Sequence, residues 1–91
     1  MKYVMLFAEG QPGEIGRKIP VIFPNELVHR EVAAMFVQCL SRHGYSNLRV
    51  ESAGFITLKD ARVHGKSESL GIEISPGDAV TILSYDWLHG L

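Results

Sequence analysis

The sequence contains one cysteine, Cys39, among its 91 residues. A single thiol excludes an intramolecular disulfide and leaves too few ligands for a cysteine-based zinc site. The residues around Cys39 are mainly apolar, which predicts a buried, unreactive thiol because burial raises the pKa of a thiol.

Concentrated charge and long apolar runs are also lacking. Nine basic and ten acidic residues give a net charge of −1, without the dense run of Lys and Arg that binds phosphates, so nucleic acid is not the expected partner. The apolar run 3–8 is shorter than the ~7–15 residues of a signal sequence or the ~20 that span a bilayer. We therefore expect a cytoplasmic protein that does not enter a membrane.

What is present is enough apolar sequence for one globular domain, residues 1–91, since 46% of the residues are hydrophobic and 21% are charged. The run 3–8 predicts a strand buried on both faces. Residues 18–23 alternate as in a second strand, and Pro20, which has no N–H to donate, places that strand at a sheet edge. Residues 48–59 predict one long strand in a single register, in which Gly54 allows either the close approach of a helix or a β-bulge.

The main helix is predicted over Asn25 to His43, with Asn25 as N-cap and Gly44 just past the end. Its apolar side chains recur at helical spacing and should face a sheet. Ser75 to Asp78 predicts a single helical turn, with Asp78 reaching back toward Ser75, before a final strand over 80–83. The predicted fold is therefore α+β, one main helix packed on a predominantly antiparallel sheet.

The segment 63–71 concentrates polar chemistry between glycines. Its candidate binding residues are His64, Lys66, Ser67, Glu68 and Ser69. An imidazole, a carboxylate and two hydroxyls could form an acid–base or small-ligand site. Alternatively, the serines satisfy backbone groups of a turn, and the charged residues are solvated.

Known catalytic motifs fit poorly. Gly65-Lys66-Ser67 resembles the end of a phosphate-binding P-loop, but Asp60 stands where that motif needs glycine. His29 and His43 lie roughly 20 Å apart on the predicted helix, too far to share one ion. We therefore expect no metal and no cofactor, and the lack of a catalytic motif favours a protein that is not an enzyme over a hydrolytic one.

Apolar residues in excess of what one domain core requires point to self-association. The candidate interface residues are Ala34, Val37, Tyr85, Trp87, Leu88 and Leu91. Left wet, they would form an adhesive patch, and a twofold homodimer is the commonest way to cover such a patch. Alternatively, Tyr85 and Trp87 cap the core of their own domain.

Several short motifs together carry a resemblance. They are Ile19-Pro20-Val21-Ile22-Phe23-Pro24, Ser52-Ala53-Gly54-Phe55 and Gly65-Lys66-Ser67-Glu68-Ser69-Leu70-Gly71, with the N-terminal Lys-Tyr-Val strand. The combination resembles small bacteriophage and prophage proteins, which have no established activity. It implies a phage or prophage origin and leaves three functions open: an accessory protein acting through self-association or a protein partner, a ligand-binding or hydrolytic protein using 64–69, and a weak nucleic-acid binder using Arg49, Lys59, Arg62 and Lys66.

Overall fold

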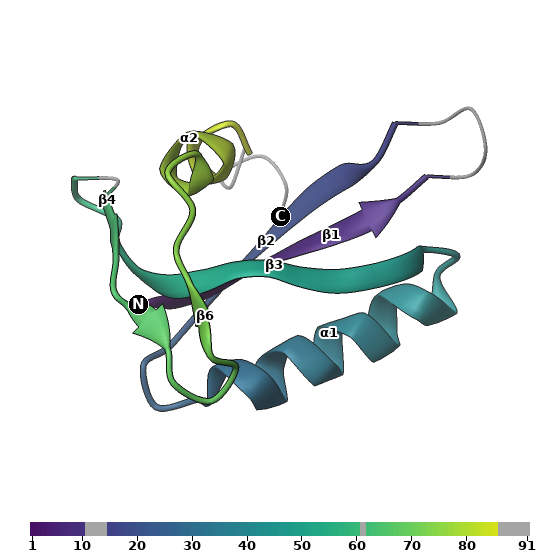
Figure 1. Cartoon of the computed structure of the whole chain (residues 1–91), viewed down its shortest axis with the longest axis horizontal. Helices are drawn as coiled ribbons and strands as arrows, with labels where there is room; N and C mark the ends of the chain where they lie inside the picture. Colours follow the sequence, from purple (N-terminus) through teal and green to yellow (C-terminus); the bar gives the residue numbers. More distant parts are fainter. Residues whose placement is uncertain (11–14, 61, 86–91) are drawn as a thin grey trace.

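The computed structural model of the chain describes residues 1–10, 15–60 and 62–85. Its elements in chain order are β1 (Lys2–Glu9), β2 (Arg17–Phe23), α1 (His29–Arg42), β3 (Ser46–Thr57), β4 (Arg62–His64), β5 (Lys66–Ser67), β6 (Ile72–Glu73) and α2 (Asp78–Leu83). Figure 1 shows the long strands crossing the molecule with the two helices beside them.

The main sheet has the strand order β2-β1-β3-β4, and all of its pairings are antiparallel. β5 and β6 form a separate two-stranded ladder. The sequence-based prediction of an α+β fold with a predominantly antiparallel sheet is thus confirmed. Two strand positions are confirmed as well, since the apolar β1 lies inside the sheet and β2, which contains Pro20, lies at an edge.

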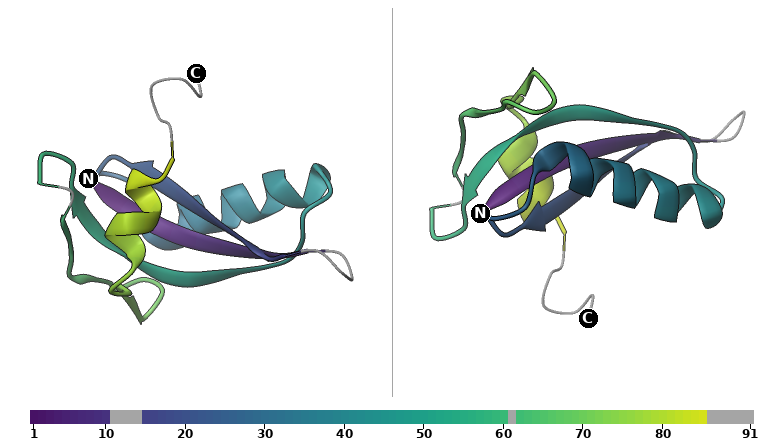
Figure 2. Two further views of the ribbon diagram at one scale, coloured as in Figure 1. Left: turned by 90° about the horizontal axis from the view of Figure 1, so that it is seen from above. Right: turned by 90° about the horizontal axis from the view of Figure 1, so that it is seen from below.

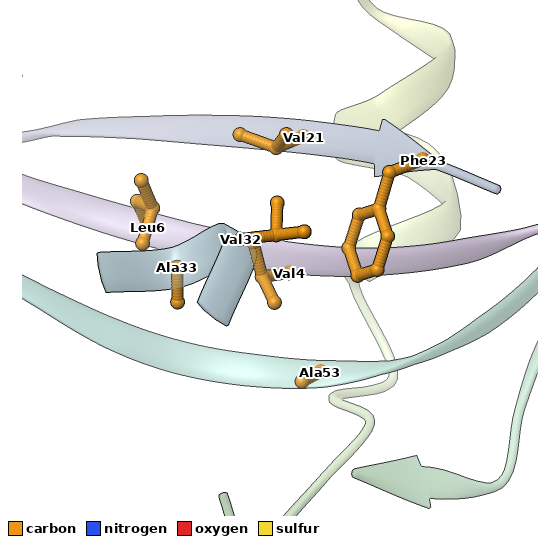
Figure 3. Close-up of a cluster of buried hydrophobic side chains, with 7 residues drawn as sticks. All are labelled: Val4, Leu6, Val21, Phe23, Val32, Ala33 and Ala53. Atoms are coloured by element: carbon orange, nitrogen blue, oxygen red, sulfur yellow. The ribbon is translucent and has the colours of Figure 1, made fainter. Parts of the chain in front are cut away.

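The two helices cover opposite faces of the sheet, as the paired views of Figure 2 show. Between the sheet and α1 lies a cluster of buried side chains from β1, β2, β3 and the helix (Figure 3): Val4, Leu6, Val21, Phe23, Val32, Ala33 and Ala53. A second cluster, Tyr3, Met5, Ile56 and Ile82, connects the other face to α2. β1 has no wet face in its middle because alternate side chains enter the two clusters.

Helix α1 begins at His29, so the predicted start at Asn25 is wrong. The Leu27 amide donates to the Pro24 carbonyl at 3.2 Å, which closes a turn, and Val28 is still extended. Lys2 Nζ holds this turn through the Leu27 carbonyl at 2.8 Å. Contacts from a distant strand therefore prevail over the local capping signal of Asn25.

The end of α1 agrees with the sequence. Gly44 has φ of +91°, a left-handed conformation that suits glycine. The Tyr45 amide donates to the Leu40 carbonyl at 3.2 Å and the Gly44 amide to the Ser41 carbonyl at 3.3 Å, which is the Schellman pattern. Helix α1 therefore ends through local chemistry, one residue before the predicted end.

β3 is as long as predicted, but its single register is wrong. Met5 pairs with Ser52 whereas Leu6 pairs with Val50, so Glu51 is an extra residue opposite β1. Such a bulge exchanges the faces of the strand. Val50 and Ala53 consequently both pack toward α1, although an unbroken strand would place them on opposite faces.

The close approach predicted at Gly54 is real, but on the side where a Cβ would stand the approaching residues do not come from α1. A Cβ on Gly54 would lie 2.5 Å from Cγ2 of Ile74 and 2.9 Å from the carbonyl oxygen of His64. The chain after β4 and the segment before α2 therefore cross β3 at this glycine.

The predicted final strand over 80–83 is wrong, because these residues belong to α2. The predicted return of Asp78 toward Ser75 is present, since Asp78 Oδ2 accepts the Ser75 amide at 2.9 Å. Ile82 is buried against the sheet, while Val80 and Leu83 face outward. One buried apolar side chain in the short helix completes the second cluster, which β-propensity alone did not reveal.

Candidate functional site

The polar segment 63–71, called the polar loop below, lies against the start of α1. Gly65 turns the chain after β4 with φ of +76°, and β5 and β6 then form a small hairpin over the sheet. Ser67 is fully buried, and its Oγ accepts the Leu70 amide at 3.1 Å. Ser69 Oγ accepts the Arg30 amide at 3.1 Å. Both hydroxyls thus satisfy backbone groups, and Ser69 supplies the helix cap that Val28 cannot give.

His64 and Glu68 do not form an acid–base pair. The His64 ring stacks on Phe55, with centroids 5.7 Å apart and planes inclined by 15°. Within residues 1–10, 15–60 and 62–85, no hydrogen bond or ion pair joins the imidazole to the Glu68 carboxylate. The loop therefore lacks the nucleophile-and-base geometry that hydrolysis requires.

A hollow of about 510 Å³ opens beside the loop. Its lining comes from four parts of the chain: Lys2, Val28, His29, Phe55, Gly65, Lys66, Glu68 and Ser69. Three of the five predicted loop residues line it, whereas His64 and Ser67 do not. Sequence reasoning missed Lys2 and Phe55, whose strands reach the hollow only through the sheet topology.

His29 is the most buried polar group of this hollow, with 4% of its surface exposed. Its Nε2 lies 2.8 Å from the Gly54 carbonyl oxygen. Since a carbonyl can only accept, Nε2 carries a proton and donates it to this oxygen. The ring also meets Phe23 and Phe55 edge-on, at 5.4 and 5.7 Å between centroids. These contacts fix the imidazole rigidly.

A buried acid, Asp78, lies on the other face of the sheet. The sequence predicted its return toward Ser75 but not its burial. Asp78 is fully buried, and its Oδ2 accepts the Tyr3 hydroxyl at 2.5 Å. Burial in the core, together with the bond to Asp78, raises the pKa of Tyr3 far above its ordinary value. Asp78 Oδ1 and Ser52 Oγ have no hydrogen-bond partner within the part of the chain that the structure describes.

The predicted interface residues have different surroundings. Ala34 is exposed on α1, whereas Val37 is half-buried against the first cluster. The Tyr85 hydroxyl donates to the Lys18 carbonyl of its own chain. Trp87, Leu88 and Leu91 lie outside the described residues.

A different flank of α1 is apolar and exposed. Met35 is 60% exposed and Phe36 37%, and Val28 and Cys39 also face solvent. The predicted burial of Cys39 is therefore wrong: the sheet covers the side of α1 that carries Val32 and Ala33. Met35 and Cys39 are spaced at i and i+4, about 40° apart around the helix, and the exposed Val28 directly precedes the first helical residue.

The described parts of the chain show no group of three or more His, Cys, Asp or Glu residues suited to a metal. No helix among them is long and apolar enough to span a membrane. The four candidate nucleic-acid cations do not converge. Arg49 pairs with Glu9 at 3.4 Å and lies over Phe7, whereas Arg62 pairs with Thr57 at the opposite end of β3.

Comparison with protein-family models, curated proteins and solved structures found no significant match.

Proposed function

We propose that this chain is a small accessory protein without enzymatic activity, of phage or prophage type, that acts in the cytoplasm by self-association. The exposed flank of α1, formed by Val28, Met35, Phe36 and Cys39, carries the proposal. Aligned apolar side chains on one side of a helix are typical of helix–helix interfaces. The hollow, in contrast, lacks a paired nucleophile and base, which favours an interaction protein over a hydrolase.

The charges beside this flank support an antiparallel pair of α1 helices. Glu31 lies in the first turn of α1 and Arg42 in the last. A twofold axis near Met35 would bring the acidic first turn of one copy beside the basic last turn of the other. Opposite helix ends would also meet, which the helix dipoles favour.

The test compares substitutions on and off the flank. Met35→Glu should shift the protein toward monomer in sedimentation equilibrium, because it places a charge at the centre of an apolar contact. Ser41→Glu adds the same charge at an exposed position about 120° around α1 from Met35 and should leave the dimer intact. A wild-type chain that is monomeric at tens of micromolar would disprove the proposal.

Cross-linking distinguishes the antiparallel arrangement from a parallel one. Around an axis at Met35, the two Cys39 positions differ by eight residues, or roughly 12 Å along the helices. A disulfide needs Cα atoms within about 7 Å, so oxidation should not join them. A Met35→Cys, Cys39→Ser variant should cross-link readily. Efficient cross-linking of the wild-type Cys39 pair would contradict the antiparallel model.

A further inference from the structure

The hollow beside the polar loop has a charge distribution that the proposed self-association does not use. Lys2 and Lys66 both line it, and neither ammonium forms an ion pair among the residues that the structure describes. Lys2 Nζ uses one of its donors on the Leu27 carbonyl and keeps the others. Glu68 is the one carboxylate among the described lining residues. The lining therefore carries an excess of positive charge.

The same hollow has an apolar wall. Phe55 is held between His29, edge-on at 5.7 Å, and His64, stacked at 5.7 Å. Val28 contributes an exposed aliphatic side chain from the residue before α1. Two lysines and an aromatic wall lining a hollow of about 510 Å³ combine a few polar groups with apolar surface, as small-molecule sites do.

We propose that this hollow binds a small aromatic carboxylate. The carboxylate would pair with the ammonium groups of Lys2 and Lys66, and the ring would pack against Phe55 and Val28. Charge-assisted hydrogen bonds and aromatic contact favour this combination over a neutral ring or a bare anion. His29, already bonded through Nε2 to the Gly54 carbonyl, keeps the wall rigid. The hollow shares Val28 with the exposed flank of α1, and its other lining residues lie outside that flank.

Because Lys66 and Glu68 carry opposite charges, removing each charge should change the affinity for a carboxylate in opposite directions. Phenylacetate is titrated into the ¹⁵N-labelled full chain, with neutral phenylacetamide as the matched probe. Amide shifts should be confined to residues around Gly65, Lys66 and Ser69, and phenylacetamide should bind about tenfold more weakly. Lys66→Met should weaken phenylacetate binding about tenfold, whereas Glu68→Gln should strengthen it. Lys59→Met, which removes an exposed lysine outside the hollow, should change the affinity less than twofold.

A second comparison identifies the source of the ligand. The affinity is measured for a peptide that ends in Phe with a free carboxylate and for the same peptide with a C-terminal amide. If phenylacetate binds at least as tightly as the peptide, a free small molecule is the ligand. Charge-dependent binding of the peptide alone would overturn the small-molecule assignment. The proposal would be overturned if phenylacetate did not bind, or if phenylacetate and phenylacetamide bound equally well. It would also be overturned if Lys66→Met left the affinity for phenylacetate unchanged while the rest of its amide spectrum matched that of the wild type.

Discussion

Removing the Tyr3 hydroxyl should destabilise the fold strongly, although no buried carbon is lost. Tyr3→Phe deletes the donor that lies 2.5 Å from Asp78 Oδ2. Among the described residues, the fully buried carboxylate then keeps one hydrogen bond, from the Ser75 amide. Hydrogen bonds to charged groups contribute ~1.5–3 kcal/mol net, so we expect a loss of about 2 kcal/mol. For a domain of this size, Tm should fall by roughly 8–16 °C.

Urea unfolding followed by circular dichroism at fixed protein concentration measures this loss. Tyr45→Phe is the matched control, because the Tyr45 hydroxyl makes no hydrogen bond within the described residues, and it should change the stability by less than about 0.5 kcal/mol. If Tyr3→Phe proved as mild as Tyr45→Phe, the bond to Asp78 would not stabilise the fold and the reasoning would fail.

The raised pKa of Tyr3 adds an alkaline test. Above the ordinary pKa of 10.0, an unfolded Tyr3 loses its proton whereas the buried native Tyr3 keeps it. The native state then binds more protons, so stability must fall as pH rises, by about 1.4 kcal/mol per pH unit for this one group. Tyr3→Phe removes that contribution. The stability difference between the wild type and the variant should therefore shrink between pH 10 and 11, and a constant difference would contradict a buried, protonated Tyr3.

Three further substitutions and one thiol reaction test other parts of the fold. Ser69→Ala should cost about 1 kcal/mol of unfolding free energy by removing the cap of α1, measured by urea denaturation. Gly54→Ala should cost ~1–3 kcal/mol because its Cβ would meet Ile74 at 2.5 Å, whereas Gly77→Ala, with open space around it, should stabilise by ~0.4–1 kcal/mol in the same assay. Cys39 should react with a thiol reagent in the folded monomer about as fast as in the unfolded chain, and strong protection of the monomer would refute its exposure.

Several elements follow from the sequence because their causes are local. The unbroken apolar run of β1 has no polar side chain to expose, so an interior position is the only stable one. Gly44 can adopt positive φ cheaply, which ends α1. Pro20 has no N–H to donate to a neighbouring strand, which assigns β2 to the edge of the sheet.

The candidate site shows where local reasoning stops. The residues Lys66, Glu68 and Ser69 were identified from composition and do line the hollow. The role of Ser69 depends on the start of α1, 39 residues away, which no local pattern encodes. The same holds for Lys2 and Phe55, which come to the hollow through strand pairing.

The sequence by itself determined the fold class, the interior position of β1, the edge position of β2 and the end of the main helix. Their causes are hydrophobic periodicity, φ preferences and the N–H that proline lacks, and these act within a few residues. Only the tertiary structure decided where α1 begins, that β3 has a bulge at Glu51, and that residues 80–83 are helical. It also decided that α1 turns Cys39 outward. These outcomes depend on hydrogen bonds and packing between segments far apart in the chain, and such contacts can exceed local propensities of a few tenths to about 1 kcal/mol.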